Sequence, residues 1–162
     1  MVPFERKLVK FRELDEKDRN IINALSENGR EKLTSISKKV GLSVDATKKR
    51  VDGLIREGVI TPTVMINYDS VGLPVAAHVY IKLAPPSEAK YEEFIAYLKK
   101  SSRILYVMFM LGDYDVYLVI LAKNTHELGE IKHEIRQKFP TVIADWKELI
   151  VSGWAKYEEL KL

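Results

Sequence analysis

Three consecutive cations, Lys48, Lys49 and Arg50, are the first residues of the chain whose type and spacing suit a definite chemistry. A row of lysine and arginine along one side of a short helix can bind the phosphates of DNA. Arginine can in addition donate two parallel hydrogen bonds to the edge of a guanine. The ordinary alternative for such a run is a basic helix face that contacts only solvent.

Helix signals place these cations on the third of three short helices. Asp15 is a typical N-cap of the first helix, and Asp18 is placed to complete a capping box with it. Thr34 and Ser43 are expected to cap the second and third helices, and Gly41 is expected to end the second. A glycine in the tight turn between two short helices is typical of a helix-turn-helix motif.

The periodicity of the third helix predicts which of its side chains are buried. The buried face is expected to comprise Thr47, Val51, Leu54 and Ile55. The outward face then holds the candidate DNA-contacting residues, which are Ser43, Asp45, Ala46, Lys48, Lys49 and Arg50. Ser43 and Asp45 have a second interpretation, because both residue types are common at helix N-termini.

The second half of the chain alternates between strand and helix patterns. Strands are expected at 75–84, 104–111, 114–122 and 142–151, with one helix opened by 85–87 and another capped by Thr125. This order of strands and helices is that of a ferredoxin-like domain. Gly112 and Asp113 fit the two-residue turn of its central hairpin. With both helices on one face of the sheet, we expect a second subunit to cover the other face.

The composition limits the class of protein. The chain has 162 residues and a formal net charge of +3, and residues 1–62 hold 14 lysines and arginines against 10 aspartates and glutamates. The absence of cysteine excludes disulfides and thiolate metal sites. The sequence has neither a signal-peptide core nor an apolar run of membrane-spanning length. A cytoplasmic protein without membrane contact is therefore expected.

Enzymatic chemistry is not indicated by the sequence. The three histidines, His78, His126 and His133, are poorly spaced for a metal site, and we expect neither a metal nor a cofactor. A glycine-rich phosphate loop and a Ser/His/Asp motif are also absent from the sequence. The protein is accordingly expected not to be an enzyme.

Five short stretches of the chain form a recognisable series. They are Leu14–Arg19 with Ile21 and Ile22, Val40–Ser43, Arg50 and Val51 with Leu54 and Glu57–Ile60, Ile66–Asp69 with Val71–Leu73, and Gly112–Asp115. The series resembles the leucine-responsive/asparagine-operon (Lrp/AsnC) family of transcriptional regulators. The resemblance implies an α+β fold, in which a winged helix-turn-helix domain precedes a ferredoxin-like (βαββαβ) RAM-type domain.

The expected domain boundaries follow from these patterns and from the resemblance. They are 1–13 for an N-terminal extension, 14–60 for the helix-turn-helix domain, 61–74 for a hinge, 75–151 for the effector-binding and oligomerisation domain, and 152–162 for a C-terminal tail.

The resemblance also implies a function. Such a protein binds double-stranded DNA as a sequence-specific regulator, forms a homodimer, and can assemble into an octamer of four dimers. It responds to a small-molecule effector, an amino acid in family members, bound between dimers. The effector-binding residues that the resemblance implies are Tyr106, Gly112, Asp113, Tyr114, Asp115 and Trp146. An acidic group among them could receive an α-ammonium group, although Gly112 and Asp113 are also fully explained as a turn.

Two other functions stay open within the same architecture. One is an amino-acid-sensing or assembly module that does not bind DNA, and the basic residues around Arg50 argue against it. The other is a sirohaem decarboxylase, which shares the two-domain arrangement. Those enzymes tend to carry a basic, aromatic stretch with histidine in the hinge, whereas Ile60–Met65 contains neither arginine nor histidine.

Overall fold

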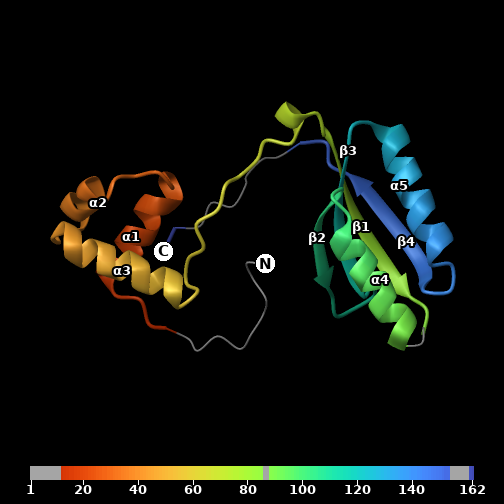
Figure 1. Ribbon diagram of the computed structural model, residues 1–162, viewed down its shortest axis with the longest axis horizontal. Coiled ribbons are helices and arrows are strands. Elements are labelled where there is room, and N and C mark those ends of the chain that lie inside the picture. Colours follow the sequence, from red (N-terminus) through yellow and green to blue (C-terminus); the bar gives the residue numbers. More distant parts are fainter. Residues whose placement is uncertain (1–11, 86–87, 154–160) are drawn as a thin grey trace. The chain divides into compact units, whose positions relative to one another are not determined.

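Two separately packed units make up the chain in a computed structural model, which describes residues 12–85, 88–153 and 161–162 (Figure 1). The units divide between Met65 and Ile66, inside the predicted hinge segment. Leu162 belongs to the N-terminal unit, where its backbone exchanges hydrogen bonds of 3.0 and 3.1 Å with the side chain of Asn23. The predicted N-terminal extension and C-terminal tail lie mostly outside the described residues. Across the described part of the chain, no helix has the length and apolar character needed to span a bilayer.

The N-terminal unit consists of three short helices with well-defined ends. They are α1 (Glu16–Glu27), α2 (Leu33–Val40) and α3 (Val44–Arg56). Asp15 caps α1 by accepting a hydrogen bond of 2.8 Å from the backbone N–H of Asp18. Ser43 caps α3 by accepting one of 3.2 Å from the backbone N–H of Ala46. Gly41 ends α2 with a φ of 66°, a left-handed conformation that glycine adopts readily. The predictions for Asp15, Ser43 and Gly41 are confirmed.

Two other predicted capping interactions of this unit are wrong. α2 begins earlier than a Thr34 cap would place it, because the carbonyl oxygen of Lys32 already accepts the first helical hydrogen bonds. Asp18 does not complete a capping box, because its carboxylate instead accepts hydrogen bonds from Arg12 and Arg50.

An apolar core joins the three helices, and α3 contributes little to it. The buried members of the core are Ile21, Ile22, Ala24, Ile36, Val40 and Leu54. Of the 13 residues of α3, only Thr47, Gly53 and Leu54 are buried. Val51 is half-buried, whereas Ile55 is 38% exposed in the last turn of the helix, so the prediction for Ile55 is wrong.

The segment between α3 and the sheet contains no strand among its described residues. Its regular element is the 3₁₀ turn Asp69–Val71, which Gly72 closes with a φ of 81°. The β-hairpin wing that a winged motif implies is therefore not formed in this structure. Four apolar side chains of the segment, those of Val64, Met65, Ile66 and Val71, are more than half exposed.

The C-terminal unit has the predicted order of strands and helices. Its elements are β1 (Val75–Leu83), α4 (Glu88–Lys100), β2 (Ile104–Phe109), β3 (Val116–Ala122), α5 (Thr125–Lys138) and β4 (Ile143–Ile150). The strands form one antiparallel sheet in the order β2-β3-β1-β4, which is the predicted ferredoxin-like arrangement. Asn124 rather than Thr125 caps α5, because its side chain accepts the hydrogen bond from the N–H of Glu127.

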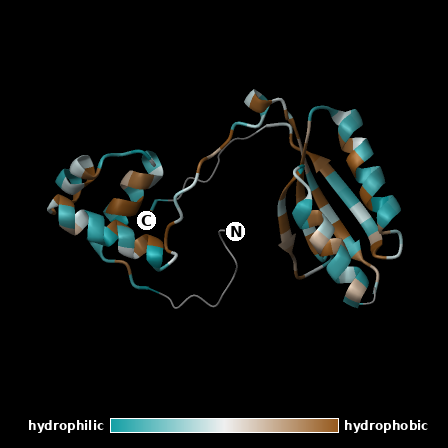
Figure 2. Cartoon of the chain, viewed as in Figure 1, coloured by the Kyte–Doolittle hydropathy of each residue, from teal (hydrophilic) through white to brown (hydrophobic). Residues whose placement is uncertain are grey.

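The two faces of this sheet differ in what covers them. Alternate residues of β1, namely Ala77, Val79 and Ile81, are completely buried in a core that α4 and α5 complete. The intervening side chains point to the opposite face, which no described helix covers, and we call it the open face. Its strand residues are Tyr106 and Met108 of β2, Tyr117, Val119 and Leu121 of β3, His78, Tyr80 and Lys82 of β1, and Asp145, Lys147 and Leu149 of β4. Figure 2 shows that hydrophobic residues extend along β2 to the edge of the sheet.

Candidate functional site

The first two turns of α3 present most of the candidate DNA-contacting residues to solvent. Four of the six candidates are exposed, namely Ser43, Asp45, Lys48 and Lys49. Ala46 is half-buried, and Thr47 on the inner side is completely buried. The hydroxyl of Thr47 donates a hydrogen bond of 2.9 Å to the carbonyl oxygen of Ser43, which anchors the start of the helix. The exposed side chains therefore project from a helix end that is fixed from inside.

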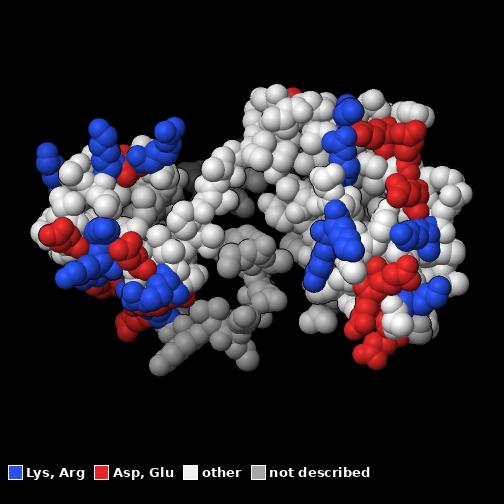
Figure 3. Space-filling model, viewed as in Figure 1, with Lys and Arg blue, Asp and Glu red and all other residues white. Residues whose placement is uncertain are grey.

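Two further lysines lie close in sequence to this face. Lys38 and Lys39 are exposed in the last turn of α2, which packs against α3. Neither they nor Lys48 and Lys49 form an ion pair with another described residue, so their ammonium groups are available to an anion. Figure 3 shows lysine and arginine side chains projecting from this unit, with acidic side chains between them. The helix-turn-helix pattern drew attention to α3 alone, although the paired lysines of α2 were visible in the sequence.

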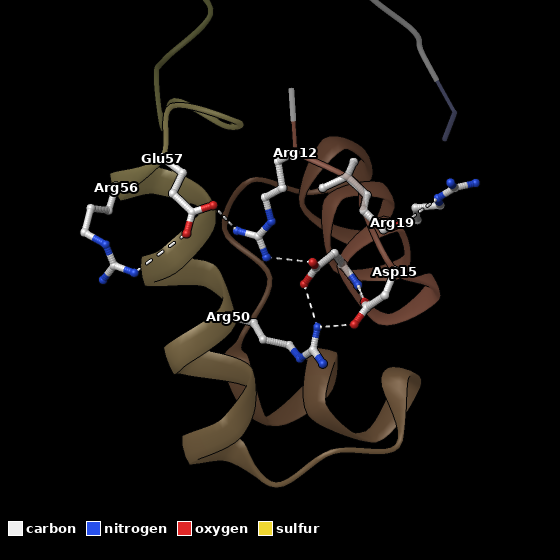
Figure 4. Close-up of polar contacts among 8 residues, drawn as sticks. Arg12, Asp15, Arg19, Arg50, Arg56 and Glu57 are labelled. Carbon is white, nitrogen blue, oxygen red and sulfur yellow. Dashed lines mark hydrogen bonds and ion pairs between the residues drawn. The ribbon is translucent and has the colours of Figure 1, made fainter. Parts of the chain in front are cut away.

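Arg50, the sixth candidate, does not project to solvent with the others. Its Nη1 atom donates to Asp15 Oδ2 at 2.7 Å and to Asp18 Oδ1 at 2.8 Å, both at the start of α1 (Figure 4). The hydrogen bond to Asp15, followed by that to Asp18, raises the pKa of the Arg50 guanidinium. The N–H of Asp18, followed by Arg50, lowers the pKa of Asp15. Arg50 thus links α3 to α1.

Asp18 lies at the centre of a larger group of charges. It is only 2% exposed, and its second oxygen accepts a hydrogen bond of 2.8 Å from Arg12 Nη2. The other nitrogen of Arg12 bonds to Glu57 at the end of α3 (Figure 4). Sequence patterns carry no signal for the contacts of Arg50 with Asp18 and of Arg12 with Glu57, because these join residues 32 and 45 positions apart.

The second candidate region is the connection between β2 and β3. The predicted two-residue hairpin at Gly112 and Asp113 is wrong, because β2 ends at Phe109 and β3 begins only at Val116. Gly112 has a φ of 141°, which a residue with a side chain would adopt only under strain. The connection is therefore a six-residue loop, 110–115, with glycine at its most constrained position.

Asp115 anchors this loop to the neighbouring strand β1. Its N–H donates to the carbonyl oxygen of Ile81 at 3.0 Å, and its carbonyl oxygen accepts from Met110 at 2.9 Å. Its carboxylate accepts a hydrogen bond of 2.8 Å from the N–H of Leu83 and lies 3.5 Å from Lys82 Nζ. These contacts engage both carboxylate oxygens of Asp115 with residues of β1.

A pocket of about 310 Å³ lies beside the loop, at the edge of the open face. The residues that line it are Tyr80, Met110, Leu111, Gly112, Asp113, Tyr114, Lys147 and Leu149. Its two charged residues, Asp113 and Lys147, carry opposite charges. Tyr114 donates a hydrogen bond of 3.4 Å to Asp145, and burial, followed by the charge of Asp145, raises the pKa of the Tyr114 phenol. The pocket thus combines an anion and a cation with apolar and aromatic walls.

Three of the six predicted effector residues line this pocket, and three do not. Gly112, Asp113 and Tyr114 line it, whereas Asp115 faces β1. Tyr106 lies on the open face but outside the lining.

Trp146 lies on the wrong side of the sheet for the predicted role. It is 8% exposed in the core beneath the helices, where its Nε1 donates to Glu148 at 2.9 Å. Neighbouring residues of a strand point to opposite faces, so Lys147 and not Trp146 faces the pocket. The sequence could have revealed Lys147 only if the face assignment of β4 had been known.

The histidines do not gather with other ligands. His126 and His133 are exposed on α5, and His78 lies on the open face, where its Nδ1 is 2.8 Å from the hydroxyl of Tyr117. Within the described residues, no group of three histidine, aspartate or glutamate side chains is arranged to hold a metal ion.

Family models match most of the two units. Residues 14–55 match the AsnC-type helix-turn-helix domain, and residues 76–143 match the Lrp/AsnC ligand binding domain. The HTH-type transcriptional regulator FL11 of Pyrococcus abyssi is 36% identical over 117 residues, which are 72% of this chain and 76% of the relative. An uncharacterised HTH-type transcriptional regulator of Pyrococcus furiosus is 30% identical over 73% of this chain and 79% of its own.

Solved structures share the fold at lower identity. E. coli AsnC superimposes with a TM-score of 0.81 at 22% identity, covering 93% of this chain and 100% of the other. The transcriptional regulator NMB0573 of Neisseria meningitidis, solved as a complex with L-Met, superimposes with a TM-score of 0.82 at 21% identity. That match covers 90% of this chain and 94% of the other.

Proposed function

The chain belongs to the Lrp/AsnC family of transcriptional regulators. From that premise we propose that its two units have separate functions. The N-terminal unit reads a specific DNA site with α3. The C-terminal unit binds an amino acid in the pocket beside Gly112 and pairs with a second copy of the chain. Occupation of the pocket changes the affinity for DNA. A protein with this role works in the compartment that holds the DNA, in line with the cytoplasmic location that the sequence predicts.

The exposed start of α3 carries the DNA-binding part of the proposal. A recognition helix places its N-terminal residues against base edges in the major groove. Asp45 and Lys49 occupy that position on α3, and Ala46 leaves room for close approach. Lys48, together with Lys38 and Lys39 of α2, suits the flanking phosphates.

The pocket beside Gly112 carries the effector part. An amino acid is a zwitterion, and the pocket offers Asp113 for its ammonium group and Lys147 for its carboxylate. Met110, Leu111 and Leu149 supply apolar contact, which favours an effector with an apolar side chain. The L-Met complex of the Neisseria meningitidis regulator supports this class of ligand. We leave Tyr106, Asp115 and Trp146 out of the proposed binding set.

The open face carries the assembly part. Met108 is 46% exposed and Leu149 is 52% exposed on a face that a small monomer would normally cover. A second copy that presents the same face would bury both side chains in a symmetric dimer. The octamer of four dimers that the family resemblance allows would bring such dimers together.

A gel-shift series on the DNA upstream of the protein's own gene tests the proposal. The experiment compares several salt concentrations, with and without a pool of amino acids. We expect a specific complex whose affinity falls steeply with salt and shifts with the pool, since phosphate contacts release counterions. Equal binding to unrelated DNA would overturn sequence-specific recognition. An identical series with and without the pool would remove the amino-acid effector from the proposal.

A further inference from the structure

We propose that Arg50 is a positioning residue, which holds the recognition helix α3 against the start of α1 and does not itself contact DNA. The inference rests on the proposed function, because it explains how α3 is aimed. It also reassigns a residue that its neighbours in sequence, Lys48 and Lys49, would place among the DNA contacts.

The geometry of Arg50 supports a role inside the unit. Its Nη1 atom divides two hydrogen bonds, of 2.7 and 2.8 Å, between Asp15 and Asp18. The side chain of Asp18 is 3% exposed, so this end of the contact lies beneath the surface. Figure 4 shows the Arg50 side chain extending from α3 toward Asp15. The Nη1 atom of Arg50 is therefore engaged by two carboxylates of the same unit, and this holds the guanidinium against the start of α1.

The weak apolar attachment of α3 explains why such a link matters. Only three of its 13 residues are buried, and two of these, Thr47 and Gly53, have small side chains. Leu54 is therefore the one large side chain that α3 buries completely in the core. Val51, which is half-buried, also packs against this core. Two apolar contacts only three residues apart still fix a helix poorly against rotation about its own axis.

Charged contacts supply the missing constraints. Arg50 bonds to Asp18, and Glu57 bonds to Arg12, which in turn bonds to the same Asp18. Arg50 and Glu57 are seven residues apart, which is about two helical turns along the same side of α3. Two anchoring points on one side define the rotation of the helix. They therefore define the direction in which Lys49 faces.

A comparison of four variants separates positioning from direct contact. Arg50→Met removes the hydrogen bonds to both Asp15 and Asp18. Asp18→Asn removes the charge that Arg50 and Arg12 share and leaves Asp15 in place. The double variant measures how far the two losses overlap. Lys48→Met, at an exposed neighbouring position on α3, is the matched control for a lost phosphate contact. Binding is measured against salt on the specific site and on unrelated DNA, at a temperature where thermal unfolding curves show every variant folded. Arg50→Lys and Asp18→Glu take their place if the first variants do not fold.

We expect Arg50→Met and Asp18→Asn to weaken specific binding by about tenfold each. The double variant should lose clearly less than the product of the two losses, because both single variants already lose the contact between Arg50 and Asp18. Nonspecific binding and the salt slope should stay as in the wild type, because no phosphate contact is lost. Lys48→Met should instead reduce the salt slope by about 0.9. A helix that is merely unstable would lose specific and nonspecific binding in the same proportion. The ratio of the specific to the nonspecific affinity therefore measures whether α3 keeps its orientation.

Three results would overturn the inference. The first is a salt slope reduced by about 0.9 in Arg50→Met together with wild-type binding in Asp18→Asn. This result would show that Arg50 contacts a phosphate. The second is a proportional loss of specific and nonspecific binding, which reduces the link to a contribution to stability. The third is a wild-type protein without site preference, which overturns the proposed function itself and the inference with it.

Discussion

The carboxylate of Asp115 accepts a hydrogen bond of 2.8 Å from the backbone N–H of Leu83, and so joins the β2–β3 loop to the end of β1. Leu83 is the residue at which the pairing of β1 with β4 shifts register. A backbone N–H at such an irregularity can lack a carbonyl partner on the neighbouring strand. The carboxylate of Asp115 supplies the acceptor for the N–H of Leu83. This contact gives Asp115 a role in the fold, in place of the effector contact predicted for it.

Replacing Asp115 by Ala should destabilise the C-terminal unit by about 1–3 kcal/mol, because it leaves the N–H of Leu83 without its acceptor. Urea unfolding followed by tryptophan fluorescence measures this, since both tryptophans, Trp146 and Trp154, follow the N-terminal unit in sequence. Asp113→Ala, on the same loop, is the control and should change stability by less than about 0.5 kcal/mol. Equal losses in the two variants would contradict the assignment.

Gly112→Val should lower stability by about 1–3 kcal/mol through backbone strain alone. The φ of 141° excludes ordinary side-chain residues, while a Cβ atom at Gly112 would meet nothing within 4 Å. We also expect a weaker response to the effector, because the strained loop is a wall of the pocket.

The control for Gly112 is Gly129→Ala. A Cβ there also meets nothing within 4 Å, but Gly129 lies inside α5, where alanine should stabilise the helix by about 0.5–1 kcal/mol. Thermal unfolding that shows Gly112→Val destabilised and Gly129→Ala stabilised would support backbone strain at position 112. A neutral Gly112→Val would show that the loop relaxes without cost.

Local signals in the sequence predict the elements of this fold well. Asp15 and Ser43 cap helices as expected because a capping contact involves residues only three positions apart. The strand at 75–84 is likewise predicted from its own residues, and β1 forms there over Val75–Leu83. Information of this kind does not depend on the rest of the chain.

The sites were predicted less well because they depend on distant contacts. Arg50 was placed outward by helical periodicity, but its long side chain reaches back to Asp18, 32 residues earlier. Trp146 and Lys147 are neighbours on β4 and point to opposite faces of the sheet. An error of one residue in the register of β4 therefore assigns Trp146 to the pocket and Lys147 to the core. Only the folded arrangement reveals that Lys147 and Asp113 line the same pocket.

Lys147→Met should raise the amino-acid concentration needed for a half-maximal change in DNA binding by about tenfold or more, because a charged hydrogen bond to the effector carboxylate is lost. Binding without amino acids should not change. Lys90→Met, at an exposed position on α4, is the matched control and should behave as the wild type. An unchanged response in Lys147→Met would exclude this residue from the effector site.

Met108→Glu should shift the protein from dimer toward monomer. Met108 lies opposite Tyr117 on the open face, where a second copy would bury the new carboxylate without a partner. Sedimentation velocity over a concentration series measures the equilibrium. Ala96→Glu, exposed on α4, introduces the same charge away from the open face and should leave the dimer intact. Dissociation in both variants, or in neither, would argue against pairing through this face.

Tyr97 should make the stability of the C-terminal unit depend on pH in the alkaline range. Burial, followed by the hydrogen bond that its hydroxyl donates to Glu134, raises the pKa of Tyr97 from 10.0 to about 12. The folded state therefore favours the neutral phenol. Its contribution to stability is complete below pH 10 and is lost as the pH rises from 10 to about 12. Urea unfolding at a series of pH values measures this loss.

Tyr97→Phe removes the ionisable group and should flatten the fall in unfolding free energy between pH 10 and about 12. Some fall should persist, because the pKa values of Tyr114 and Tyr117 are also raised by burial. Glu134→Gln provides the second comparison. It should keep most of the dependence on Tyr97, since burial rather than the carboxylate is the larger cause of the raised pKa. A wild-type curve that coincides with that of Tyr97→Phe over this range would show that the phenol ionises equally well in the folded chain.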